Sequence, residues 1–145
     1  MNARQSALLC LDSGTSAVKA AAFDRQGRII ASAQRDNRAL RRHGDLVEQD
    51  MALSRDDAFD VLRSCVDQAN TAVDCILVTG QGDGLWPLDR RRETMGPAIT
   101  WLDARARPLV TALGTSGHLA RIRAITSSRP TTASQCLQLL WLKAN

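Results

Sequence analysis

The chain has 145 residues, 44% of them hydrophobic and 23% charged, which is enough for one domain with a real core and argues against wholesale disorder. Its net charge is +4 and 17 of its 19 basic residues are Arg, but acidic residues lie between them, so the charge alone does not predict a nucleic-acid partner. No apolar run approaches the roughly 20 residues that span a bilayer, and a membrane role is not predicted.

The cysteines and the N-terminus indicate the compartment. None of the cysteines forms a C-x-x-C pair or has a His at metal-ligand spacing, and each lies in an apolar segment (Cys10, Cys65, Cys75 and Cys136). We interpret them as free thiols that pack as small core residues, which suits a reducing compartment. Met1 to Ser6 is polar, and the apolar run after it is too short for a secretory signal. The cytoplasm is the expected location.

The stretch from Leu8 to Asp24 predicts a hairpin that binds phosphate. Two apolar runs of strand length flank the turn Ser13-Gly14-Thr15-Ser16. Gly14 would adopt backbone angles closed to other residues and leave no side chain between amide groups and an anion. Asp12, at the carboxyl end of the first strand, could hold a metal ion or its water against that phosphate. An ordinary hairpin with a capping Asp explains the same residues.

The next segment predicts a three-strand meander and a helix. Arg28 to Ala33 indicates a third strand, and the polar, basic stretch Arg35 to Asp45 indicates a loop. Ser54 to Ala69 is the best helix of the sequence, with Ser54 and Asp57 resembling a capping box. Its apolar positions recur on one face, which should pack on the sheet, and Asn70 is the expected stop (Ala58, Leu62, Cys65, Val66 and Ala69).

A second candidate ligand loop follows the next strand. Asp74 to Thr79 is a continuous apolar run of the kind that is buried on both faces of a sheet. It opens into Gly80 to Trp86, which has three glycines at alternate positions with Gln81 and Asp83 between them. Polar side chains at the end of a buried strand can reach a ligand, and the glycines let that ligand approach the backbone.

Farther along, Leu85 to Asp89 and Ala98 to Trp101 predict a second hairpin around an Arg-rich turn. Strand alternation would place Trp101 and Asp103 on one side, and an aromatic face with a carboxylate is a pairing that holds sugars and polyols. A buried Trp with an exposed Asp is the alternative. Short helices are expected after Ala104, and Ser134 to Lys143 predicts the last helix.

Five segments, in the same order, resemble the FGGY carbohydrate kinases of the actin-like ATPase superfamily, and the resemblance covers nearly the whole chain. Leu11 to Ser16 with Lys19 resembles the family's opening phosphate loop. Val47-Glu48-Gln49-Asp50 is similar to its Trp-Glu-Gln-Asp. The remaining three resemble the sugar-contacting loop, the Pro-Ala-Ile-x-Trp-x-Asp-x-Arg segment and the Leu-Leu-Trp-Leu-Lys helix (Thr79 to Gly84, Gly96 to Arg105 and Leu139 to Lys143).

The resemblance implies an α/β fold of the ribonuclease H-like (actin-like ATPase) type, with a mixed sheet in the order 3-2-1-4, the fifth strand missing, and flanking helices. It also implies ATP-dependent phosphorylation of a sugar or polyol hydroxyl. Asp12 would act through Mg²⁺ by way of water, and phosphate contacts would come from the hairpin (Asp12, Ser13, Gly14, Thr15, Ser16 and Lys19). The sugar or polyol that accepts the phosphoryl group would be bound by residues of the second candidate ligand loop and of the Trp-x-Asp segment (Gln81, Gly82, Asp83, Trp101 and Asp103). The Gln-Gly-Asp-Gly loop is most similar to that of erythritol-type polyol kinases.

The chain departs from the family in length. The family's catalytic base is an Asp expected beyond Asn145, and the ATP-binding C-terminal domain is absent, so residues 1–145 are interpreted as part of the N-terminal, sugar-binding domain and as inactive alone. Asp74 to Thr79 would be left at a sheet edge, which predicts self-association or a homodimer. A non-catalytic ligand-binding or remnant fragment is the alternative function. A third class, an Arg-dependent nucleic-acid binder, would show affinity that falls steeply with salt.

Overall fold

The structure, a computed structural model, describes residues 6–145, so most of the polar N-terminal stretch lies outside the described residues. Its contacts divide the chain into two compact units, where composition alone suggested a single core. The first contains the chain up to Leu40 and then Ala52 to Gln81, and the second contains Arg41 to Met51 and Gly82 to Asn145. None of the helices in this described part is long and apolar enough to cross a membrane.

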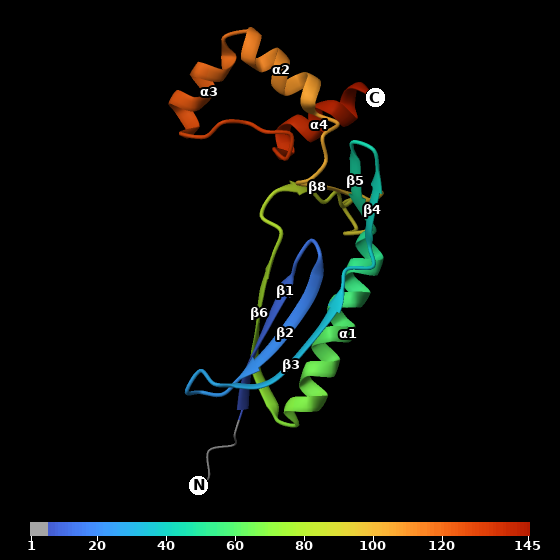
Figure 1. Ribbon diagram of the computed structural model, residues 1–145, viewed down its shortest axis with the longest axis vertical. Coiled ribbons are helices and arrows are strands. Elements are labelled where there is room, and N and C mark those ends of the chain that lie inside the picture. The colour runs from blue at the N-terminus through green and yellow to red at the C-terminus, as the bar shows by residue number, and fades with distance from the viewer. Residues whose placement is uncertain (1–5) are drawn as a thin grey trace. The chain divides into compact units, whose positions relative to one another are not determined.

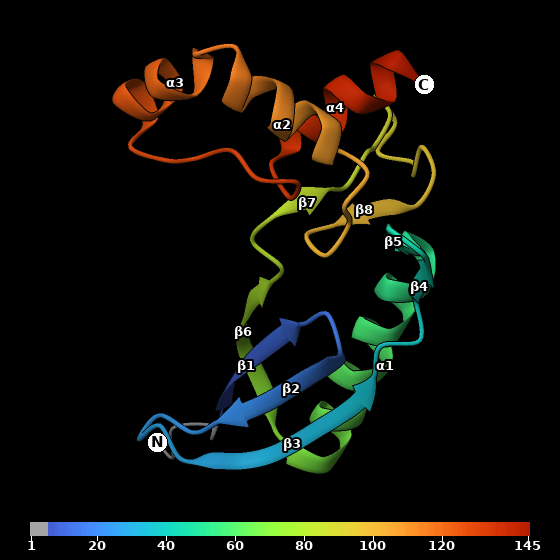
Figure 2. The same ribbon diagram turned by 45° about the horizontal axis from the view of Figure 1, so that its top comes forward.

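The first unit is a four-stranded mixed sheet with one helix packed on it (Figures 1 and 2). Its elements are β1 (Ser6–Ser13), β2 (Ala17–Phe23), β3 (Ile29–Asp36), α1 (Met51–Ala69) and β6 (Ala72–Gly80). The strand order is β3-β2-β1-β6, with β1 antiparallel to β2 and parallel to β6. This confirms the predicted order 3-2-1-4, because β6 is the fourth core strand.

The core of the first unit lies between the sheet and α1. Alternate residues of β1 and β2 are buried against the helix, which contributes Val61 and Cys65 (Ala7, Leu9, Leu11, Val18, Ala20 and Ala22). Full burial of a side chain such as Leu9 stabilises the fold by about 1.5–3 kcal/mol. The predicted helix face is confirmed as the face that packs on this core, with Val61 added at its centre. Asn70 has φ 45° and donates its N–H to Val66 O, which confirms the predicted stop.

Two predictions about α1 and the segment before it were wrong. The helix begins at Met51, so Ser54 and Asp57 are buried inside it and do not form a capping box. The stretch predicted as a loop contains the end of β3 and the strand β4 (Leu40–His43). A polar, basic composition indicates exposure, but exposed residues also form strands when a partner strand supplies their backbone hydrogen bonds.

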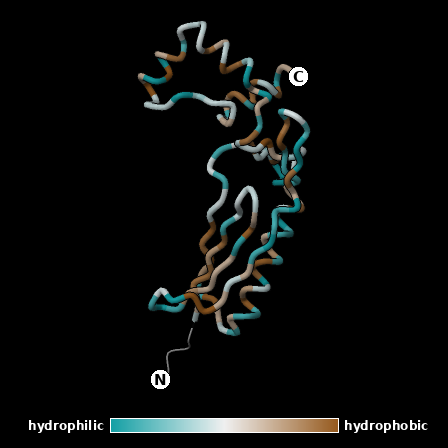
Figure 3. The backbone as a smooth tube through the Cα atoms, in the orientation of Figure 1, coloured by the Kyte–Doolittle hydropathy of each residue, from teal (hydrophilic) through white to brown (hydrophobic). Residues whose placement is uncertain are grey.

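The strand β6 is exposed, contrary to the prediction that it is buried on both faces. Its only partner in the sheet as described is β1, and Ile76, Leu77 and Val78 are 54%, 53% and 70% exposed. Figure 3 shows hydrophobic stretches along the strands of this unit. The other part of the expectation, an apolar strand at a sheet edge, is confirmed.

The second unit contains a small sheet and three helices. The sheet has the order β4-β5-β8-β7, with β5 (Leu46–Gln49), β7 (Gly84–Leu85) and β8 (Ala98–Thr100), and the helices are α2 (Arg107–Thr115), α3 (His118–Thr126) and α4 (Gln135–Ala144). The antiparallel pairing of β7 with β8 confirms the predicted second hairpin. On α4, which confirms the predicted last helix, Leu137 is buried and Leu140 is 53% exposed.

Candidate functional site

The hairpin between β1 and β2 ends in a tight turn that needs glycine for a steric reason. Gly14 donates its N–H to Ala17 O at 3.1 Å. A Cβ on Gly14 would lie 2.8 Å from that same oxygen, closer than real Cβ contacts. Gly14 is not among the residues with positive φ, so the predicted reason, an unusual backbone angle, was wrong. The glycine is required because the chain approaches itself closely.

Asp12 lies in a row of polar residues that crosses the whole sheet of the first unit. In the registers of the three strand pairs, Lys19 on β2 and Thr79 on β6 are the neighbours of Asp12 on either side, and Gln34 on β3 is the neighbour of Lys19. Paired residues on adjacent strands point to the same face. All four side chains therefore stand on the face that is turned away from α1, because their sequence neighbours Leu11, Val18 and Ala20 pack toward it.

The same four residues line a cleft of about 510 Å³ on that face. Its floor is apolar, with Cys10, Ala21 and Phe23 among the residues that line it. Asp12 and Lys19 are exposed, and no ion pair between them is formed. Sequence reasoning identified Asp12 and Lys19 but missed Gln34 and Thr79. Only the strand register, which fixes which residues are neighbours across the sheet, could have indicated them.

The turn residues Ser13, Thr15 and Ser16 also lie in the first unit, at the end of the hairpin beyond Asp12. Ser16 O accepts a hydrogen bond from Asn37 N at 2.9 Å. Gly14 O accepts one from Asn37 Nδ2 at 3.1 Å. The structure thus brings together all six residues predicted to contact phosphate, in one turn and the adjoining row of the sheet.

The predicted acceptor residues fall on both sides of the division of the chain. Gln81 is the last residue of the first unit, and Gly82, Asp83, Trp101 and Asp103 belong to the second. Within the second unit, Asp83 is exposed and follows the exposed Gly82.

Gly84 holds the end of this loop against the sheet. It has φ +104°, and a Cβ there would lie 2.7 Å from Ile99 O, so only glycine fits. Its N–H also donates to Ala133 O at 3.2 Å.

Trp101 and Asp103 do not share a side of a strand, so that prediction was wrong. β8 ends at Thr100, and Trp101 and Leu102 form a turn, which removes the strand alternation on which the prediction relied. Trp101 is 47% exposed, whereas Asp103 is fully buried. This is the reverse of the alternative considered from sequence, a buried Trp with an exposed Asp.

The Asp103 carboxylate is occupied by protein hydrogen bonds. Its Oδ2 accepts from Val47 N at 2.7 Å and its Oδ1 accepts from Arg105 N at 2.9 Å. The Arg105 guanidinium donates to both oxygens at 2.8 Å. A buried carboxylate that accepts four hydrogen bonds has a structural role, and we remove Asp103 from the residues expected to touch an acceptor.

Arg105 joins three separate motifs of the second unit. It donates to Asp103, it donates to Glu48 Oε1 at 2.6 Å, and its guanidinium lies 5.1 Å from the centre of the Trp141 ring. Its side chain is only 6% exposed. Burial disfavours the charge, but the hydrogen bonds with Asp103 and Glu48 outweigh it and raise the Arg105 pKa above its ordinary value. The spacing of the three motifs in the sequence did not predict that they contact one another through Arg105.

Within residues 6–145 the structure gathers no group of three or more His, Cys, Asp or Glu side chains that could hold a metal ion. All four cysteines are free, as predicted, but only Cys65 is fully buried, and Cys75 and Cys136 are exposed. Burial raises the pKa of the Cys65 thiol, which keeps it protonated and inert.

The sequence matches the N-terminal domain of the FGGY family of carbohydrate kinases over residues 7–145, which includes both units. It is 38% identical over 122 residues to an erythritol kinase from Brucella abortus, an alignment that covers 80% of this chain and 23% of the relative. It is 30% identical to a glycerol kinase from Acinetobacter baylyi, covering 95% of this chain and 29% of the relative.

Among solved structures, Plasmodium falciparum glycerol kinase with ADP superposes with a TM-score of 0.88 and 22% identity, over 97% of this chain and 29% of that one. At this identity the likeness shows the fold alone, which confirms the predicted fold class. The chain spans between a fifth and a third of the length of each of these three proteins.

Proposed function

Because the chain belongs to the FGGY family of carbohydrate kinases, we propose that it supplies the phosphate-holding hairpin and the acceptor-binding residues of an enzyme that phosphorylates a polyol with ATP. The structural observation that carries the proposal is the row of Gln34, Lys19, Asp12 and Thr79 beside a turn that only glycine permits. Phosphoryl transfer depends mainly on positioning and charge neutralisation, and these residues offer a cation, hydroxyls and backbone N–H groups for that purpose.

Asp12 fits a role beside Mg²⁺. It is an exposed carboxylate in a cleft with no competing ion pair, and Mg²⁺ prefers one or two carboxylates together with water and substrate phosphates. Such an ion would neutralise charge on the transferred phosphate. ATP as the donor agrees with the ADP in the solved Plasmodium glycerol kinase.

The acceptor residues we propose are Gln81, Gly82, Asp83 and Trp101. The exposed ring of Trp101 can stack on the C–H groups of a polyol, and Asp83 can accept hydrogen bonds from its hydroxyls. The 38% identity with the Brucella erythritol kinase supports a short polyol such as erythritol as the substrate. We expect the general base in the part of the relatives that this chain does not span, and free cysteines agree with the cytoplasm as the compartment.

A titration with polyols tests the proposal on the 145-residue chain. The three Trp indole N–H signals are followed by NMR while erythritol, glycerol or ribitol is added, and Trp101→Phe assigns its own signal. We expect saturable shifts at Trp101, with Trp86 and Trp141 as internal controls. If no polyol moves the Trp101 signal, the acceptor site is wrong.

A coupled assay of ADP release tests the chemistry. We expect no turnover by the chain alone, because holding the two substrates without a base leaves the acceptor hydroxyl protonated. Saturable turnover by the chain alone would contradict the expectation that the base lies elsewhere. Binding without turnover separates the proposal from an inert remnant, which would bind neither polyol nor phosphate.

A further inference from the structure

We propose that Asn37 is a positioning residue that fixes the turn between β1 and β2 in the conformation a phosphate requires. Asn37 lies directly after β3, and it contacts the turn twice: its backbone N donates to Ser16 O at 2.9 Å, and its side-chain Nδ2 donates to Gly14 O at 3.1 Å. The side-chain Oδ1 accepts from Ala39 N at 2.9 Å, so both ends of the amide are engaged. The inference rests on the proposed role of the turn in holding phosphate.

The two contacts matter because each is a hydrogen bond to a backbone carbonyl group of the turn and fixes the direction in which that carbonyl points. Peptide bonds are planar and trans, and no cis peptide bond is present in the described residues. A carbonyl held toward Asn37 therefore turns the N–H of the same peptide unit to the opposite side. Fixing Gly14 O and Ser16 O directs the N–H groups of Thr15 and Ala17 away from Asn37. The two carbonyl oxygens carry partial negative charge, and these hydrogen bonds keep them away from the opposite side of the turn, where an anion would need hydrogen-bond donors.

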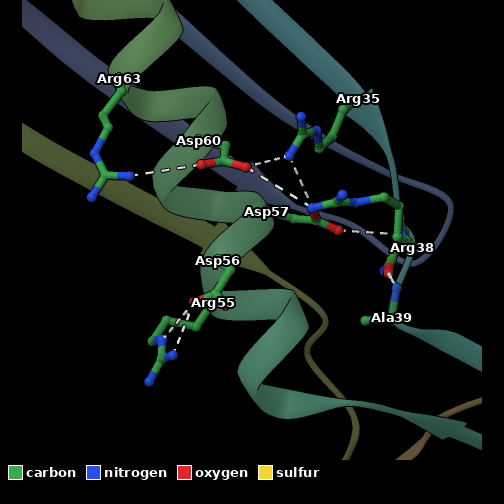
Figure 4. Close-up of polar contacts among 9 residues, drawn as sticks. Arg35, Arg38, Ala39, Arg55, Asp56, Asp57, Asp60 and Arg63 are labelled. Atoms are coloured by element: carbon green, nitrogen blue, oxygen red, sulfur yellow. Dashed lines mark hydrogen bonds and ion pairs between the residues drawn. The ribbon is translucent and has the colours of Figure 1, made fainter.

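Asn37 is itself anchored by its neighbour in the chain. Arg38 donates its backbone N to Asp57 Oδ2 at 3.2 Å and its Nε to Asp57 Oδ1 at 2.7 Å, and its terminal guanidinium nitrogen also contacts this carboxylate. Asp57 is fully buried on α1. Figure 4 shows Arg35 and Arg38 pointing toward Asp57 and Asp60 on that helix, with Ala39 beside Arg38.

A continuous set of hydrogen bonds and ion pairs connects α1 to the β1–β2 turn. Arg35, two residues before Asn37, donates to Asp60 at 2.5 Å and to Asp57 at 3.3 Å. The segment on either side of Asn37 is thereby tied to the helix that packs on the sheet. The position of the turn is set by the core of the unit as well as by the hairpin itself.

The turn at the other end of the same sheet offers a matched control. Asp24 accepts from the backbone N of Gln26 and of Arg28, both at 2.9 Å, so that turn is restrained by its own residues. The hydrogen bond from Asn37 to Gly14, in contrast, spans 23 positions in the sequence. A substitution at Asp24 removes similar local hydrogen bonds without touching the β1–β2 turn.

Three variants of the 145-residue chain, Asn37→Ala, Asn37→Asp and Asp24→Ala, are compared with the unmodified chain by NMR. Asn37→Asp keeps the acceptor for Ala39 N but loses the donor to Gly14 O. We expect the Gly14 N–H to exchange with solvent about 5-fold faster or more in both Asn37 variants, since one hydrogen bond contributes on the order of 1 kcal/mol. Asp24→Ala should leave Gly14 exchange unchanged and raise it only near residues 26–28.

A titration with magnesium pyrophosphate then connects the turn to its ligand. We expect shifts at the amides of residues 13–16 in the unmodified chain and in Asp24→Ala, and at least about 5-fold weaker binding in Asn37→Ala and Asn37→Asp. Equal binding by the Asn37 variants, or Gly14 exchange within about twofold of the unmodified chain, overturns the inference. If the unmodified chain itself shows no shift, the proposed phosphate role fails, and the exchange rates still decide whether Asn37 holds the turn.

Discussion

Replacing Asp57 is expected to destabilise the first unit more than replacing any exposed acid of α1. The side chain is fully buried and accepts from Arg38 through its backbone and its guanidinium, and from Arg35. Removing one partner of a fully buried ion pair destabilises a protein by about 3–5 kcal/mol. Here the Arg38 and Arg35 side chains are 52% and 35% exposed, so water can solvate them once the carboxylate is gone.

The expected loss in the free energy of unfolding is therefore about 2–3 kcal/mol for Asp57→Ala and about 1–2 kcal/mol for Asp57→Asn, which keeps an acceptor for the Arg38 backbone N–H. For a unit of this size, 1 kcal/mol corresponds to about 4–8 °C in the melting temperature.

Asp60→Ala is the matched control, because Asp60 lies on the same helix and binds the same Arg35 but is 44% exposed. It should lower the free energy of unfolding by less than about 1 kcal/mol. Urea unfolding followed by far-UV circular dichroism, with hydrogen exchange of α1 and β3 peptides, measures the difference. An Asp57→Ala variant no less stable than Asp60→Ala would refute the reasoning.

Three further outcomes are expected. Burial raises the pKa of Asp57, but the hydrogen bonds from Arg38, the charge of Arg38 and the hydrogen bond from Arg35 outweigh it and hold that pKa below its ordinary value. The stabilisation that the Asp57 carboxylate contributes is thus complete above the unfolded-state pKa of about 3.9 and is lost as pH falls below it. Between about pH 6 and pH 2, the melting temperature should therefore fall less steeply with pH in Asp57→Asn than in the unmodified chain. Gly14→Ala should cost about 1–3 kcal/mol of stability in urea unfolding and abolish the pyrophosphate shifts, because its Cβ would meet Ala17 O, whereas Gly82→Ala, with nothing within 4 Å, should be near neutral. Val78→Lys on the exposed edge of β6 should reduce self-association in sedimentation velocity, and a monodisperse unmodified chain would contradict that expectation.

The second unit shows how family motifs can serve structure as well as chemistry. Glu48, Asp103 and Trp141 come from three motifs that resemble the kinase family, and all three contact Arg105. Two of these motifs therefore meet at the partly buried ion pair between Arg105 and Glu48, and the third meets them at a cation–π contact. This explains why a motif residue such as Asp103 can be fully buried while Trp101, two positions earlier, stays exposed.

The sequence by itself determined the elements of the first unit, and the resemblance of its motifs to a known family supplied their order in the sheet. The alternation of apolar residues, the glycine turn after Asp12 and the periodicity of α1 are local signals, because each depends on residues a few positions apart. The sequence also singled out the hairpin, through an acid followed by small and hydroxyl-bearing residues. Its motifs identified the family, and the match over residues 7–145 agrees with that identification.

Only the tertiary structure decided which side chains meet. Thr79 and Gln34 join Asp12 through strand register, and Asn37 reaches Gly14 across 23 positions of the chain. Asp103 was assigned to the acceptor from its spacing to Trp101, yet the turn after β8 directs it into the protein. Register, burial and ion pairing arise from contacts between distant segments, and one strand that ends a residue early reverses which of Trp101 and Asp103 is exposed.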